Sequence, residues 1–365
     1  MKIGKITVKS IAFSAHLCYN NMGNYIETET IMFDIWNRRY TGSKYKLSSW
    51  ISELIAENCN GSSFCDIFAG TGIISYTMLD KMKKIYINDF LYSNEVIYKA
   101  FFDAAPYDKN KISEYCSRFQ SLSADNIDEN YLSINFGGKF FSHTDAKLIG
   151  HIREVIESDK DKLSDKEFAI LLASLLYSAD KSANTVGHYD AYIKGHEIPD
   201  TFKFDLINPY KTKKSQIAIS REDSNEFAHK LKCDIVYIDP PYNSRQYSRF
   251  YHVLENITCW RKPELHGVAL KPDPENMSDY CRNKAKIVFK ELIDSLDCKY
   301  IVVSYNNTYE SKSSSSKNKM TLEDIETALS TRGEVQRFET SHNFFNAGKT
   351  EFSDHKELIF IVKVK

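Results

Sequence analysis

The sequence predicts an α/β fold in which an open sheet binds a ligand at the carboxyl ends of its strands. Three short runs that are apolar or rich in β-branched and aromatic residues indicate strands, at residues 64–67, 85–88 and 235–238. Helical patterns follow the first two runs, and alternation of strands with helices is typical of parallel sheets. Ligands of such sheets bind just beyond the carboxyl ends of the strands.

The third run ends at an acid followed by two prolines and an aromatic residue, Asp239, Pro240, Pro241 and Tyr242. Proline lacks the N–H of a sheet ladder, so the strand must end at Asp239. A carboxylate and a backbone carbonyl there can accept both N–H groups of the exocyclic amine of adenine, while Tyr242 stacks on the base. The simpler alternative is an ordinary turn in which Asp239 caps a helix.

A glycine turn follows the first run. Gly70 and Gly72 let the backbone approach a ligand closely, as in nucleotide-binding turns between a strand and a helix. The third glycine of the dinucleotide fingerprint is missing, so a pyrophosphate is not required. Asp89 ends the second run about twenty residues later, where an acid can accept both hydroxyls of a ribose. Together these features favour a nucleoside-type cofactor site over a coincidental turn.

A second loop with a basic residue precedes an amphipathic helix near the start of the chain. Gly42 and Lys44 lie in this loop, and apolar residues then recur at helical spacing from Leu47 to Ile55. Backbone N–H groups at a helix start, with a lysine beside them, can seat a carboxylate or phosphate. A basic capped helix without such a role is also common.

The alternation of strands and helices lapses over 105–230, which predicts a long insert with helices at 145–158 and 165–181. A polar and aromatic segment, 179–194, suits stacking and hydrogen bonding, or an ordinary loop. Four lysines follow beside aromatic residues: Lys203, Lys211, Lys213 and Lys214. Basic residues among aromatics can contact nucleic acid, but they can equally form a solvated face.

Two arginines and four aromatic residues lie just after the Pro-Pro turn. Arg245 and Arg249 flank Tyr247 in this segment, directly beside the predicted chemical centre. A base drawn out of a duplex would have to be held at such a place. We therefore expect these residues to contact DNA.

The composition indicates a folded protein without a metal or membrane role. Of the 365 residues, 42% are hydrophobic, and the net charge of −1 leaves only local patches to attract nucleic acid. Eight scattered cysteines show no zinc-binding spacing and predict reduced thiols in the cytoplasm. No run approaches the roughly 18 apolar residues of a membrane span.

The pattern of residues 300–363 predicts the remaining strands of the sheet. A strand is expected over 300–305, a helix over 322–329, and a closing hairpin from 334–339 and 357–363. The serine- and lysine-rich stretch 311–319 predicts a loop.

The order of these motifs over about residues 35–365 resembles the D12 class, or alpha group, of DNA N6-adenine methyltransferases of restriction–modification systems. The resemblance rests on the Tyr-x-Gly-Ser-Lys loop, the Phe-x-Gly-x-Gly turn, the acid of the second strand, the long insert and Asp-Pro-Pro-Tyr. The segments 179–194 and 243–255 and the Ser304–Asn307 motif add to it.

The resemblance implies an S-adenosylmethionine-dependent methyltransferase fold, with a mainly parallel seven-stranded sheet, an antiparallel last strand and an inserted, largely helical target-recognition domain. The implied parts are an N-terminal extension (1–35), a catalytic domain (36–104 and 231–365) and the insert (105–230). The implied site residues are Tyr40, Gly42 and Lys44 at the methionine end of the cofactor, Asp66, Phe68, Gly70 and Gly72 in its main turn, Asp89 at the ribose, and Asp239 to Tyr242 at the adenine.

The implied activity is direct methyl transfer to N6 of an adenine flipped out of duplex DNA, with no metal and no covalent enzyme intermediate. DNA would be held by clustered faces at 203–214, 245–262 and 282–290, and a restriction endonuclease would act separately. Two alternatives stay open. An RNA N6-adenine or protein glutamine methyltransferase would share the cofactor turn, and a non-catalytic DNA-binding protein would share the basic clusters.

Overall fold

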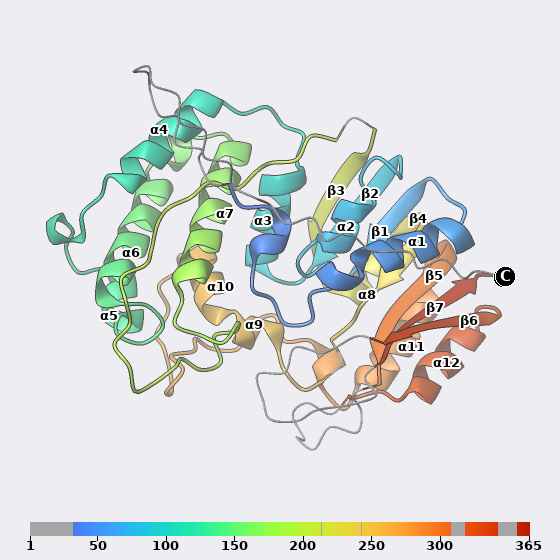
Figure 1. The fold of residues 1–365 in the computed structure, drawn as a ribbon. Coiled ribbons are helices and arrows are strands. Elements are labelled where there is room, and N and C mark those ends of the chain that lie inside the picture. The colour runs from blue at the N-terminus through green and yellow to red at the C-terminus, as the bar shows by residue number, and fades with distance from the viewer. Residues whose placement is uncertain (1–31, 213, 242, 308–317, 342–355) are drawn as a thin grey trace, which may run out of the picture. The chain divides into compact units, whose positions relative to one another are not determined.

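A seven-stranded sheet forms the centre of the computed structural model, which describes residues 32–365 except 213, 242, 308–317 and 342–355. The strand order is β3-β2-β1-β4-β5-β7-β6 (Figure 1). The strands are β1 (Ser63–Asp66), β2 (Lys84–Asp89), β3 (Gln216–Arg221), β4 (Lys232–Ile238), β5 (Asp297–Asn306), β6 (Val335–Ser341) and β7 (Lys356–Lys363). The first five run parallel, and β7 is antiparallel to both of its neighbours. The predicted fold class, including the antiparallel last strand, is confirmed.

Alternate residues of the strands face two separate hydrophobic cores. On β1, Phe64 belongs to one core and Cys65 to the other, as do Ile235 and Val236 on β4. This period of two is what a sheet covered on both faces requires. The first core includes α1 (Ser48–Asn58), α2 (Ile73–Thr77) and α3 (Tyr92–Phe102), and the second includes α8 (Ser224–Ala228), α11 (Ala285–Ser295) and α12 (Leu322–Ser330).

Most of the remaining helices form a group beside α3 (Figure 1). They are α4 (Lys109–Gln120), α5 (Tyr131–Phe136), α6 (His143–Ser158), α7 (Asp165–Ser182), α9 (Tyr247–Phe250) and α10 (His252–Cys259). Short 3-10 turns occur at Ile35–Asn37, Tyr45–Leu47, Ala124–Asn126, Lys160–Lys162 and Asp279–Cys281. The helices predicted at 145–158 and 165–181 are confirmed as α6 and α7.

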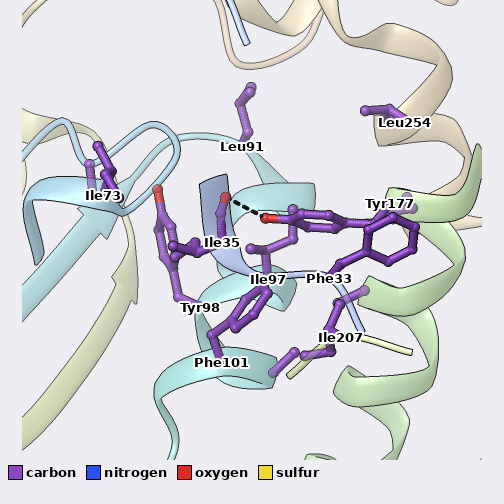
Figure 2. Packing of buried hydrophobic residues seen from close by; sticks show 14 of the residues in the cluster. Phe33, Ile35, Ile73, Leu91, Ile97, Tyr98, Phe101, Tyr177, Ile207 and Leu254 are labelled. Atoms are coloured by element: carbon purple, nitrogen blue, oxygen red, sulfur yellow. Dashed lines mark hydrogen bonds between the residues drawn. The ribbon is translucent and has the colours of Figure 1, made fainter. Parts of the chain in front are cut away.

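Helix α7 is the centre of this group, because nearly all of its residues are buried. It begins at a capping box in which Ser164 and Glu167 exchange hydrogen bonds. Its Tyr177 hydroxyl donates to the carbonyl of Ile35 at 3.0 Å (Figure 2). The same view shows Phe33 and Ile207 packed beside it. This core holds the segment that leads into the Gly42 loop.

One boundary predicted for the insert is wrong. The range 105–230 includes β3, which pairs in parallel with β2 from Gln216 to Arg221 and so belongs to the sheet. Helix α8 follows it on the second face of the sheet. The part of the chain that leaves the sheet therefore ends before Gln216, and β3 brings the residues after Arg221 to the same edge as Asp89.

The other predicted elements agree with the structure. The strand at 300–305, the helix at 322–329 and the closing hairpin are β5, α12 and the antiparallel pair β6 and β7. Residues 1–31 and most of 311–319 lie outside the described residues. In the described part of the chain, no helix is both long and apolar enough to cross a membrane, and no group of three potential ligands could hold a metal ion.

Candidate active site

One open cavity lies at the carboxyl ends of β1, β2, β3 and β4. Seven of the eight residues predicted for the cofactor line it, together with Asp239 and Pro241: Tyr40, Gly42, Lys44, Asp66, Phe68, Gly70 and Asp89. Gly72, the eighth, begins the turn into α2 and does not line the cavity. Pro240 is buried beside it, and Tyr242 lies outside the described residues.

The turn after β1 requires its glycines. Gly70 and Gly72 have φ values of +54° and +76°, in the left-handed region that side chains disfavour. A Cβ atom on Gly72 would also lie 3.0 Å from Cδ1 of Ile35 and 3.1 Å from Cε1 of Tyr98. The sequence prediction of a close backbone approach at this turn is consistent with this geometry.

Asp89 is held in place by two backbone N–H groups, one from the glycine turn and one from the residues after β2. Its Oδ2 accepts from the N–H of Gly70 at 2.9 Å, and its Oδ1 accepts from the N–H of Leu91 at 3.0 Å. Burial raises the pKa of the Asp89 carboxyl, and these two hydrogen bonds act in the opposite direction. The acid is thus oriented before any ligand arrives.

Asp66, the last residue of β1, has hydrogen-bond donors at only one of its two carboxylate oxygens. Its Oδ2 accepts from the backbone N–H of Ser75 at 3.2 Å and from its hydroxyl at 2.9 Å. Its Oδ1 is buried and has no hydrogen-bond partner among the described residues. Burial, and to a smaller extent the charges of Asp239 and Asp89, raise the pKa of Asp66 to about 7. A donor from a ligand in the cavity would satisfy this oxygen.

We expect Asp66 to make the protein less stable as the pH rises from about 4 to about 7. In that interval the unfolded chain releases the Asp66 proton, because an exposed aspartate has a pKa near 3.9, while the folded chain still holds it. Above pH 7 both states are ionised and the effect is constant. Thermal unfolding of the Asp66→Asn variant, compared with the parent, should show a gain in Tm that grows from pH 4 to 7 and then levels off. A difference that does not vary with pH would contradict the raised pKa.

Lys44 reaches across the site to the end of β4. Its Nζ lies 3.1 Å from Oδ2 of Asp239 and 3.9 Å from Oε2 of Glu357, and the three side chains are only 6%, 16% and 9% exposed. Burial lowers the pKa of Lys44, but the two carboxylates outweigh it, so the net shift is upward and the lysine stays charged. The structure therefore pairs Lys44 with the predicted catalytic carboxylate.

Aromatic rings form one wall of the cavity. The ring of Tyr40 stacks on Tyr251 with 4.7 Å between centroids, and Tyr247 lies 5.3 Å from Tyr40. The Tyr247 hydroxyl donates to the carbonyl of Thr41 at 3.1 Å. Gly42, with φ +80°, passes so close that a Cβ atom would lie 3.1 Å from this hydroxyl. Tyr247, which is predicted to contact DNA, lines the cavity.

The predicted DNA contacts do not lie together. Arg245 and Arg249 stay near the cavity: the Arg245 guanidinium is 5.7 Å from the ring centroid of Phe250, and Arg249 donates to the carbonyl of Pro272. Lys211 and Lys214 are exposed and precede β3, at the amino ends of the strands. The backbone N–H of Lys214 donates to Asp80, just before β2. Lys213 lies outside the described residues.

The polar and aromatic segment 179–194 lies beside α9. The N–H of Tyr189 donates to the carbonyl of Phe250 at 2.7 Å, and the ring of His188 stacks on Phe250 with 4.6 Å between centroids. The Tyr189 hydroxyl donates to the buried Asp180 at 3.0 Å. Segments far apart in the sequence therefore meet near Arg245.

Sequence reasoning missed three contributors to the site. Gln246 and Ser278 exchange two hydrogen bonds of 2.8 Å and both line the cavity. Glu357 was missed although it begins a predicted strand. An antiparallel last strand starts at the edge where the parallel strands end, and this direction was the available signal. Nothing local marks the pairing of Gln246 with Ser278.

Comparison with known proteins gives consistent matches. Residues 40–321 match the family model for D12 class N6 adenine-specific DNA methyltransferases. The chain is 29% identical over 334 residues to the type II methyltransferase M.NlaIII of Neisseria lactamica, covering 87% of this chain and 95% of that protein. It is 31% identical over 293 residues to the modification methylase StsI of Streptococcus sanguinis, covering 74% of this chain and 44% of that protein.

A third relative has the same pattern of partial coverage as StsI. The type II methyltransferase M.FokI of Planomicrobium okeanokoites is 30% identical over 352 residues, covering 89% of this chain and 52% of that protein. The chain thus spans about half the length of StsI and M.FokI, but nearly all of M.NlaIII. The family model covers well over half of this chain. The chain belongs to the family of D12 class N6 adenine-specific DNA methyltransferases.

Proposed function

We propose that this chain transfers the methyl group of S-adenosylmethionine to N6 of an adenine in double-stranded DNA, as the modification enzyme of a restriction–modification system whose endonuclease acts separately. The observation that carries the proposal is the cavity in which Asp239, fixed by Lys44, lies beside the glycine turn and Asp89. The family implies a methyl donor, and the named relatives are modification methylases.

The lining of the cavity suits S-adenosylmethionine. The buried Oδ1 of Asp66 calls for a hydrogen-bond donor, which an ammonium group can supply. Asp89 still has lone pairs for ribose hydroxyls after accepting from Gly70 and Leu91. Tyr40, Gly42 and Lys44 would lie near the methionine end, and Phe68 near the turn. When bound, this cofactor supplies a methyl group on a positively charged sulfur, which makes the methyl carbon an electrophile.

In the proposed reaction, Asp239 would orient the adenine. Lys44 holds the Asp239 carboxylate at 3.1 Å, and this carboxylate and the backbone carbonyl of Pro240 would accept the two N6 hydrogens. This turns the nitrogen lone pair toward the methyl carbon. N6 would accept the methyl group and release one proton, which Asp239 or water would take up. Tyr242 would stack on the flipped base.

The DNA would lie over Arg245, Arg249 and the segment 179–194, which meet beside the cavity. We expect Arg245→Ala to weaken DNA binding and to reduce the slope of log K against log salt by about one, as for a lost phosphate contact. Lys211→Ala is the matched control, because Lys211 is exposed at the opposite edge of the sheet. Fluorescence anisotropy with a labelled duplex, over a range of salt concentrations, measures both. A larger effect for Lys211→Ala would contradict this placement and would indicate that DNA binds at the opposite edge of the sheet.

Mass spectrometry tests the proposed function directly. The protein is incubated with unmethylated duplex DNA and S-adenosylmethionine, and the digested DNA is analysed for N6-methyladenine, with Asp239→Ala as the control. Methylated base formed only by the intact protein supports the proposal. Cofactor binding without any methylated DNA would overturn it and direct the search to RNA or protein, and binding of DNA alone would indicate a non-catalytic protein.

A further inference from the structure

Glu357 comes to the active site from the far end of the chain. It is the second residue of β7 and pairs in register with Asn306, the last residue of β5. Because β7 is antiparallel, its amino-terminal end lies at the edge where β4 delivers Asp239. The Glu357 side chain is only 9% exposed. A carboxylate is rarely buried without a reason of charge or hydrogen bonding.

The charges around Lys44 form a group of three. Lys44 lies 3.1 Å from Asp239 and 3.9 Å from Glu357, so it bridges the two acids. Lys44 and Asp239 alone would nearly cancel one another. With Glu357 ionised, these three side chains together carry two negative charges and one positive charge, and charges in a partly buried site are less screened than at the surface.

A net negative charge matters for the proposed reaction. N6 gains positive charge as it bonds to the methyl carbon, so the transition state is more positive at N6 than the ground state. Fixed charge aimed at the place where charge develops lowers the barrier. Lys44 by itself would work against this, because its positive charge lies close to Asp239. Glu357 offsets it.

We propose that Glu357 is a positioning residue for methyl transfer, which holds Lys44 on Asp239 and keeps the charge of the group negative beside N6. The inference rests on the proposed function and extends it to a residue of β7. Glu357 does not line the cavity, so it acts through Lys44. Its effect should therefore fall on the chemical step and spare the binding of both substrates.

The test compares three variants in single-turnover methylation with saturating cofactor and duplex DNA. Glu357→Gln keeps the size of the side chain but removes its charge, and we expect the rate to fall about tenfold, which is about 1.4 kcal/mol. Glu357→Asp should recover part of the rate. Glu339→Gln is the matched control, because Glu339 lies on the neighbouring strand, is exposed and pairs with Lys356. Cofactor affinity and Tm are measured for each.

The pH–rate profile adds a result that a purely structural role would not give. Lys44 faces Asp239, Glu357 and Tyr237, and the two acids raise its pKa. Asp239 in turn faces Lys44, Asp66 and Tyr247. Without the charge of Glu357, Lys44 loses its proton at lower pH. The alkaline limb of the Glu357→Gln profile should therefore move to lower pH, while that of Glu339→Gln stays.

The outcomes separate this inference from the proposed function. If the unmodified protein methylates no DNA, the proposed function fails first. If it is active and Glu357→Gln reacts at the same rate with the same alkaline limb, the inference is overturned and Glu357 is structural. A parallel loss of Tm and cofactor affinity, without rescue by Glu357→Asp, overturns it as well.

Discussion

Asp239→Asn should slow methyl transfer by about 10²–10³-fold while the affinity for S-adenosylmethionine changes little. Removing one fixed hydrogen-bonding group aimed at the reacting atoms typically has an effect of this size. Asparagine is the more informative variant, because it keeps the volume beside Lys44. Asp239→Ala should abolish transfer, but it would also leave the buried Lys44 with fewer acceptors, and breaking a buried pair is strongly destabilising.

Two measurements distinguish a catalytic role of Asp239 from a structural one. Isothermal titration with the cofactor reports binding, and single-turnover methylation reports chemistry. Loss of the rate alone assigns Asp239 to the adenine. If both variants lose cofactor binding and rate together, Asp239 maintains the shape of the cavity and the assignment is wrong.

Asp89→Ala should weaken cofactor binding by about 10- to 150-fold, since a hydrogen bond to a charged group contributes about 1.5–3 kcal/mol. The variant removes an acceptor for ribose hydroxyls and also frees the N–H groups of Gly70 and Leu91. The glycine turn then loses one of its contacts with the next strand, while the hydrogen bond from the N–H of Ala69 to the carbonyl of Asn88 remains. At saturating cofactor, the rate should recover much of its value.

Asp108→Ala is the matched control for Asp89. Asp108 also accepts from two backbone N–H groups, at the start of α4, but it does not line the cavity. We expect it to reduce Tm without changing the cofactor affinity. Unchanged affinity in Asp89→Ala would refute the ribose assignment, and equal losses in both variants would mean that the effect on binding comes only from stability.

The strands beside the cavity could be predicted because their sequence carries strong local signals. The run before Asp239 is fully apolar and is stopped by two prolines, so both its structure and its end were defined. Gly70 and Gly72 marked the turn because only glycine adopts its left-handed backbone easily. Strand β3 was missed, because it is an edge strand in which no residue is fully buried and which lacks a clear apolar run.

The directions of side chains were harder to predict than the elements. Tyr247 lies in a segment rich in arginine and aromatic residues, yet its hydroxyl turns to Thr41 and its ring to Tyr40. Lys211 and Lys214 form a basic cluster in the sequence, but the topology of β3 places them at the opposite edge from Asp239. Both outcomes depend on tertiary packing, which spacing along the chain does not encode.

The position of β7 between β5 and β6 has a consequence for folding. Strand β6 precedes β7 in the chain, and among the described strands it pairs with β7 alone, so it has no place in the sheet until β7 has been synthesised. Until then the edge of β5 is also open, and unpaired edges invite pairing with other chains. Phe64 on β1 pairs with Ile235 on β4, so this pairing also cannot form until β4 has been synthesised. Pairings between residues so distant in the sequence slow folding. Strand β7 therefore both covers the edge of β5 and carries Glu357, so Glu357 reaches Lys44 only when this edge of β5 has been paired.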